Sequence, residues 1–127
     1  MNSRNRITAA EAHKLRKEHP DAPGEFIDYL RIVGGGSFRE CQFAVFAFLG
    51  PPEGVCGPID WKEPDLPKLC FGDNFSGDLA AFLPTEDWAV AEMWHDCGTI
   101  YRTKKDFSEY IREAMLMAKD GSDTSEA

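Results

Sequence analysis

The sequence predicts an α+β domain with a central, mostly antiparallel sheet of about five strands. Two N-terminal helices and one C-terminal helix are expected to pack on this sheet. Apolar residues recur at helical spacing near both ends of the chain, and short apolar strands separated by glycine and proline turns lie between them. At 127 residues and 43% hydrophobic composition, the chain can bury one core. We therefore expect one domain over 8–118, a flexible N-terminus over 1–7 and a disordered tail over 119–127.

A capping box predicts where the first helix begins. The Thr8 side chain can accept a hydrogen bond from the Glu11 amide, and the Glu11 side chain can reach back. The helix should end at about His19, because Pro20 cannot continue it. Its apolar face is thin, so we expect the helix on the surface of the domain.

The second helix is expected to open at Pro23 and to end at the glycines 34–36, which tolerate the left-handed conformation of a helix C-terminus. The last helix is expected to start at a box-like cap over 103–106 and to have the cleanest amphipathic pattern in the chain. Apolar residues of the second helix recur at i, i+3, i+4 and i+7, namely Phe26, Tyr29, Leu30 and Val33.

The strands are predicted between these helices, over 42–49, 68–71, 78–83, 88–95 and 99–101. The first is apolar on both of its alternating faces, which is typical of a strand covered on both sides. In 88–95, alternation places Val90 and Trp94 on one face and Met93 on the other. The proline-rich segment that follows the first strand, up to residue 67, is predicted to be irregular.

The charge distribution favours a basic partner. The net charge is −8, and residues 23–101 hold 13 acidic and 4 basic residues. Direct nucleic-acid binding is disfavoured, because it needs clustered lysine and arginine. An acidic surface attracts basic proteins, although acidity alone also serves solubility. No apolar run is long enough for a membrane helix, so we expect a cytoplasmic protein that does not bind membranes.

No metal or cofactor is expected. The four cysteines form no C-x-x-C pair, so free and mostly buried thiols are expected, and a zinc site with His95 lacks the close ligand spacing. The segment 73–78 resembles a calcium loop only superficially, since Phe75 occupies a ligand position and Pro84 stands where a glutamate is needed. His95 and Cys97 could form a nucleophile pair, but no orienting group is evident, and we assign no catalytic residue.

Trp61 lies among carboxylates in the proline-rich segment. A rigid loop with one exposed tryptophan would suit partner recognition. The same side chain could instead cover the edge of the core. The sequence leaves both alternatives open.

The order of four motifs resembles the SUKH superfamily, which includes Smi/Knr-like regulators of cell-wall assembly. The motifs are the proline-led helix 23–30 with its glycines, the glycine–aspartate turn 69–79, the hairpin 90–100 and the final helix start 107–111. The resemblance covers about residues 8–118. The chain departs from the family pattern at Val33-Gly34-Gly35-Gly36 and in the loop 50–67.

The resemblance implies an immunity protein, which binds a cognate toxin, often a nuclease, and blocks it without chemistry. A regulatory or scaffolding domain that binds an endogenous protein is the alternative, and an enzyme using His95 and Cys97 is a further one. We expect a monomer or weak homodimer. The candidate partner contacts, with Trp61 as the anchor, are Asp60, Trp61, Glu63, Asp65, Asp73, Glu86 and Asp87.

Overall fold

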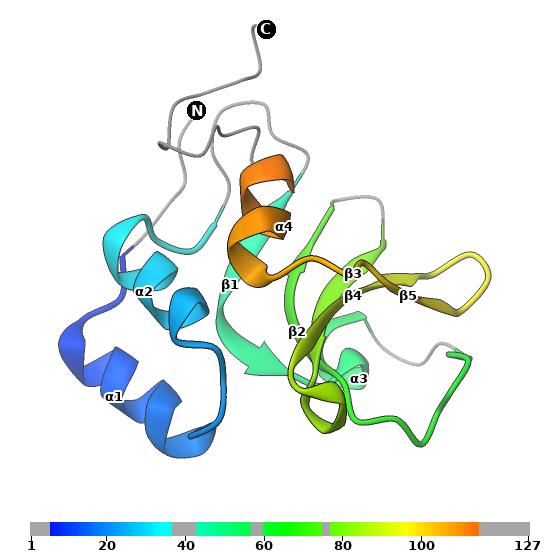
Figure 1. The fold of residues 1–127 in the computed structure, drawn as a ribbon, viewed down its shortest axis with the longest axis horizontal. Coiled ribbons are helices and arrows are strands. Elements are labelled where there is room, and N and C mark those ends of the chain that lie inside the picture. Colours follow the sequence, from blue (N-terminus) through cyan, green and yellow to red (C-terminus); the bar gives the residue numbers. More distant parts are fainter. Residues whose placement is uncertain (1–5, 37–42, 57–59, 75–76, 115–127) are drawn as a thin grey trace, which may run out of the picture.

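The computed structural model describes residues 6–36, 43–56, 60–74 and 77–114. Its centre is one five-stranded sheet in the order β1-β2-β3-β4-β5, in which every neighbouring pair is antiparallel (Figure 1). Together with the helices, this sheet confirms the α+β prediction. The strands are β1 (Ala44–Gly50), β2 (Leu69–Asp73), β3 (Leu79–Leu83), β4 (Ala89–Trp94) and β5 (Thr99–Arg102).

Helix α1 (Ala9–Glu18) begins with the predicted capping box. The Glu11 amide donates to Thr8 Oγ1 at 3.1 Å, and the Thr8 amide donates to Glu11 Oε1 at 2.9 Å. Just before the helix, Ile7 is buried, and its amide donates to the Leu30 carbonyl at 3.1 Å. Ile7 therefore packs against the domain, while residues 1–5 and the expected tail 119–127 lie outside the described residues.

Helix α2 (Gly24–Ile32) follows Pro23 and packs beside α1. Its end agrees with the glycine prediction. Gly34 has φ 106°, a left-handed conformation that glycine adopts without strain, and its amide donates to the Tyr29 carbonyl at 2.9 Å. Phe26 and Leu30 on the predicted stripe are fully buried.

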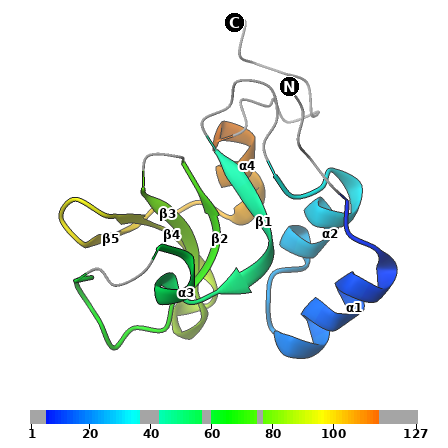
Figure 2. The ribbon, with the colours of Figure 1, turned by 180° about the vertical axis from the view of Figure 1, so that it is seen from behind.

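Apolar side chains fill both faces of the sheet. Helices α2 and α4 (Phe107–Ala114) cover one face, while α3 (Pro52–Cys56) and the loop 60–68 lie on the other (Figure 1 and Figure 2). The first core is built around the rings of Phe26, Phe71, Phe82 and Phe107. The second contains Trp61, Cys70, Leu79, Ala81, Leu83, Ala91, Met93 and Ile100.

The first strand and the segment directly after it differ from the sequence prediction. Ala47 is exposed and Phe48 is 49% exposed, so β1 is not covered on both faces along its whole length. Phe46 packs against the second core, and the Phe48 ring stacks on the Phe46 ring at 5.0 Å. The apolar side chains of β1 therefore continue past the edge of the second core into solvent. The short helix α3 lies where only a chain break was predicted, because proline suits a first helical turn.

The last helix begins about one turn later than predicted. Asp106 caps α4 by accepting from the Glu109 amide at 2.8 Å, and the Asp106 amide donates to Glu109 Oε1 at 3.2 Å. The Thr103 hydroxyl instead donates to the Val90 carbonyl at 3.0 Å. The capping box is therefore Asp106 with Glu109, and Thr103 ties the incoming chain to β4.

Candidate functional site

Arg102, the last residue of β5, brings two acidic segments together. Its guanidinium donates to both Glu63 carboxylate oxygens at 2.8 and 2.9 Å, and to both Glu86 oxygens at 2.8 and 2.6 Å. Such bidentate, charge-assisted bonds fix both distance and orientation. The loop 60–68 and the 3-10 turn Pro84–Glu86 therefore lie side by side. The loop, the turn and the residue that ends the turn carry Asp60, Glu63, Asp65, Glu86 and Asp87, and we call these five residues the acidic surface.

The bonds from Arg102 favour the ionised forms of Glu63 and Glu86. They are the largest cause that lowers the pKa values of Glu63 and Glu86 below the usual range. In return, donating to Glu86 and Glu63 raises the pKa of Arg102. The cluster thus holds two negative charges for one positive charge.

Three further carboxylates add negative charge to the acidic surface. Asp60, Asp65 and Asp87 are exposed, and none of them has an ion pair with any residue that the structure describes. Asp87 adopts a left-handed conformation with φ 56°, which aspartate tolerates better than most residues and which ends the 3-10 turn. The acidic surface therefore presents negative charge to solvent.

Trp61 does not belong to this surface, which corrects its expected role as a partner anchor. Only 8% of the side chain is exposed, and it packs in the second core with residues such as Met93. The next residue, Lys62, donates its amide to the Gly98 carbonyl at 2.8 Å. Of the two alternatives that the sequence left open, the structure has the second, in which Trp61 covers the edge of the core. The indole anchors the loop to the sheet.

Asp73 also lies apart from the other candidates. It is the last residue of β2 and pairs with Ala44 and Leu79, at the end of the sheet away from Pro84. The sequence placed it in a turn, whereas the strand extends through it. The structure therefore joins two of the seven candidate contacts, Glu63 and Glu86, through Arg102. Asp60, Asp65 and Asp87 belong to the two segments that carry this pair, whereas Trp61 and Asp73 lie apart from it.

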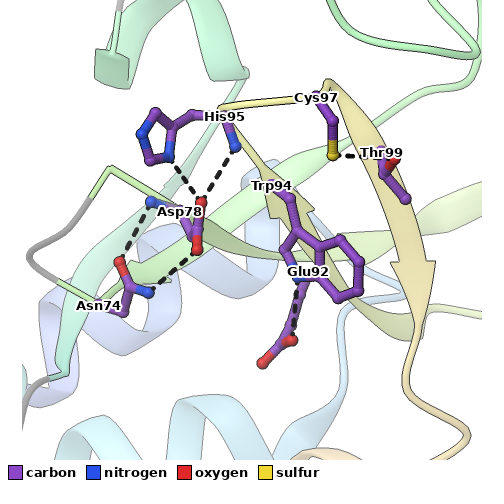
Figure 3. Close-up of polar contacts among 7 residues, drawn as sticks. All are labelled: Asn74, Asp78, Glu92, Trp94, His95, Cys97 and Thr99. Carbon is purple, nitrogen blue, oxygen red and sulfur yellow. Dashed lines mark hydrogen bonds and ion pairs between the residues drawn. The ribbon is translucent and has the colours of Figure 1, made fainter.

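Asp78 is the centre of a second polar cluster (Figure 3). Its Oδ1 accepts the His95 amide at 3.0 Å and lies 2.7 Å from His95 Nδ1. Asn74 completes the cluster, since its Oδ1 accepts the Asp78 amide at 3.1 Å and its Nδ2 donates to Asp78 Oδ2 at 3.3 Å. These bonds close the turn between β2 and β3 and join it to the end of β4.

His95 and Cys97 have different partners in this structure. The imidazole faces Asp78, while the Cys97 thiol donates to Thr99 Oγ1 at 3.1 Å (Figure 3). The geometry thus gives no support to a nucleophile pair formed by these two side chains.

The network around Asp78 predicts a loss of stability in acid. Burial, the largest influence, raises the pKa of Asp78, but the bonds from His95 and Asn74 together outweigh it and lower the pKa. A carboxylate with a lowered folded-state pKa stabilises the fold above its unfolded pKa of about 4, and this contribution disappears as the pH falls through the folded value. We expect urea unfolding to show that the stability difference between the wild type and Asp78→Asn shrinks between pH 5 and pH 3.

Asp96→Asn is the control for this measurement. Asp96 lies in the same hairpin, is exposed and has no bonded partner in the described part of the chain. Its stability difference from the wild type should stay near zero at both pH values. A difference for Asp78→Asn that is the same at pH 3 and pH 5 would contradict the role given to Asp78.

The described residues contain no group of three or more histidine, cysteine, aspartate or glutamate side chains that could hold a metal ion. Cys70 is buried and Cys97 is exposed. Within the same residues, no helix has the length and apolar character needed to cross a membrane.

Sequence reasoning missed Arg102 and Glu92. Arg102 is 39 residues from Glu63 in the chain, and no local pattern connects them. Glu92 lies in the middle of β4 and accepts hydrogen bonds from Trp94 and Tyr110. A charged residue on the inward side of a strand was the available signal, because such a residue needs partners.

In comparisons with known proteins, no family model, curated protein or solved structure matches this chain. Its class is therefore stated from the fold and the site, as an α+β domain with an acidic surface formed by two loops.

Proposed function

We propose that this chain is a non-enzymatic binding domain that covers a basic surface of a protein partner. The observation that carries the proposal is the Arg102 clamp, which fixes Glu63 and Glu86 beside each other and joins two acidic loops into one surface. A preorganised surface binds with a smaller loss of conformational entropy than mobile loops would.

A toxin domain, and in particular a nuclease, is the partner class that we propose. A nuclease holds phosphate with lysine and arginine, and an acidic protein can cover that surface by charge complementarity. The resemblance of the sequence to the SUKH superfamily, whose bacterial members are typically immunity proteins, agrees with this partner. The mechanism would be stoichiometric occlusion, with the carboxylates steering the approach and pairing with the partner's cations.

The proposal is tested by affinity capture with the tagged full chain at low and at high salt. A single basic protein should be captured at low salt and released as the ionic strength rises, because exposed charges are screened. Asp60→Lys/Asp65→Lys should slow association with that protein at least tenfold, since it reverses two exposed charges on the acidic surface.

Glu18→Lys/Asp21→Lys is the matched control. Both positions are exposed, lie at the end of α1 and in the following turn, and receive the same change of charge. This variant should slow association much less. Equal effects of the two double variants would show that net charge, and not the acidic surface, governs binding. Capture of endogenous non-basic proteins alone would favour a regulatory or scaffolding role instead.

A further inference from the structure

A second site lies where the β4–β5 hairpin meets α4, away from the acidic surface. It is a hollow of about 230 Å³ lined by Glu92, Lys105, Tyr110, Glu113 and Ala114. Sites for whole small molecules usually enclose about 300–1,000 Å³. A hollow of this size suits one side chain of a partner better than a complete metabolite.

Glu92 lines this hollow and is held in a fixed orientation by two hydrogen bonds. The Tyr110 hydroxyl donates to its Oε2 at 2.9 Å, and the Trp94 indole donates to its Oε1 at 3.3 Å (Figure 3). Burial, followed by the charge of Glu92, raises the pKa of Tyr110, so the phenol stays protonated and remains a donor. The carboxylate is therefore a preorganised acceptor with lone pairs to spare.

An aromatic platform lies next to that carboxylate. Tyr101 is directly opposite Glu92 in the β4–β5 pairing. Its ring stacks on Trp94 at 5.2 Å with an interplanar angle of 18°, and 47% of Tyr101 is exposed. An exposed aromatic face beside a carboxylate attracts cations, and the planar guanidinium group suits both at once.

The hollow already contains a cation of this chain. Lys105 Nζ lies 2.5 Å from Glu113 Oε2. The bond to Glu113 is the main cause that raises the pKa of Lys105, and the charges of Glu113 and Glu92 act in the same direction. Exposed pairs of this kind are weak, so a better-fitting cation can displace the lysine.

We propose that this hollow binds an arginine side chain of a protein partner and that Lys105 is the internal cation that the arginine displaces. The guanidinium stacks on Tyr101 and pairs with Glu92 and Glu113, while Lys105 swings into solvent. We call these four residues, Glu92, Tyr101, Lys105 and Glu113, the cation cleft. The inference does not rest on the proposed function, because the cation cleft shares no residue with the acidic surface.

The test is a two-dimensional NMR titration of the full chain with N-acetyl-arginine amide, and with the neutral isostere N-acetyl-citrulline amide as the matched ligand. The indole signal of Trp94, one of three tryptophans and identified through Trp94→Phe, reports on the site. Arginine amide should shift this signal with a millimolar Kd, and citrulline amide should not. Glu92→Gln and Tyr101→Ala should each weaken the arginine affinity at least fivefold.

Lys105→Gln and Lys104→Gln separate displacement from net charge. Both remove one positive charge at adjacent exposed positions, but only Lys105 lines the hollow. Lys105→Gln should tighten arginine binding two- to fivefold, and Lys104→Gln should leave it nearly unchanged. The inference is wrong if both variants tighten binding equally, or if arginine and citrulline amides shift the Trp94 signal alike. It is also wrong if no shift occurs even in Lys105→Gln.

Failure of this titration leaves the affinity capture described above unaffected. Failure of the capture likewise leaves the titration valid, since the probe needs no identified partner. If the captured partner responds to Asp60→Lys/Asp65→Lys but not to Tyr101→Ala, the acidic surface binds it and the cation cleft does not.

Discussion

Phe82→Ala is expected to destabilise the protein by about 3–5 kcal/mol, the usual cost of removing a large side chain from a packed core. Phe82 is fully buried in β3. Its ring centroid lies 4.5 Å from that of Phe71, 5.6 Å from Phe26 and 5.9 Å from Trp88. Because a domain of this kind is stable by only about 5–15 kcal/mol, the loss is a large fraction of the total. Urea unfolding followed by circular dichroism measures it.

Two variants keep this prediction falsifiable. Phe82→Leu retains most of the volume, so it should remain folded if the alanine variant does not, with a loss of about 1–1.5 kcal/mol. Phe48→Ala removes the same atoms from a side chain that is 49% exposed, and its cost should stay below about 1 kcal/mol. A loss for Phe48→Ala as large as that for Phe82→Ala would show that the second core, and not the first, contributes most to stability.

The local chemistry of the chain made most of the fold predictable. Thr8 and Glu11 are three residues apart, so both halves of their capping box are visible in the sequence, and the structure has both bonds. The glycines after α2 are equally local. The capping box of α4 was placed too early because Thr103 and Asp106 both offer capping oxygens. The structure uses Thr103 to reach the carbonyl of Val90, a residue on another strand.

The candidate site was less predictable, because its contacts are not local. The sequence supplied the carboxylates of the acidic surface, but only the folded sheet places Arg102 between Glu63 and Glu86. Burial of Trp61 depends on the course of the whole loop across the second face. A tryptophan between acidic residues looks the same in sequence whether it faces a partner or its own core.

Gly98→Ala is expected to cost about 2–4 kcal/mol, the sum of backbone strain and a steric clash, and to loosen the loop that carries three of the five residues of the acidic surface. Gly98 turns the β4–β5 hairpin with φ 73°, which an alanine adopts only with strain of about 1–2 kcal/mol. A Cβ there would also lie 2.4 Å from the backbone oxygen of Asp60, so the hairpin and the loop must move apart. Separation breaks the bond from the Lys62 amide to the Gly98 carbonyl, next to buried Trp61 and the clamped Glu63. Urea unfolding measures the cost, and Trp61 should become more exposed to a fluorescence quencher.

A second substitution at Gly98 separates the backbone strain from the steric clash, and a substitution at Gly24 serves as the control. Gly98→Asn suits the left-handed conformation but still carries a Cβ, so it should recover the strain and not the clash. If close approach to Asp60 is decisive, the asparagine variant stays destabilised and its loop stays loosened. Gly24→Ala is the control, because a Cβ at Gly24 meets nothing within 4 Å, and its stability should be unchanged or slightly raised. A Gly98→Ala variant as stable as Gly24→Ala would show that the loop does not dock on the hairpin in solution, and the acidic surface would then lack the fixed geometry on which its binding role depends.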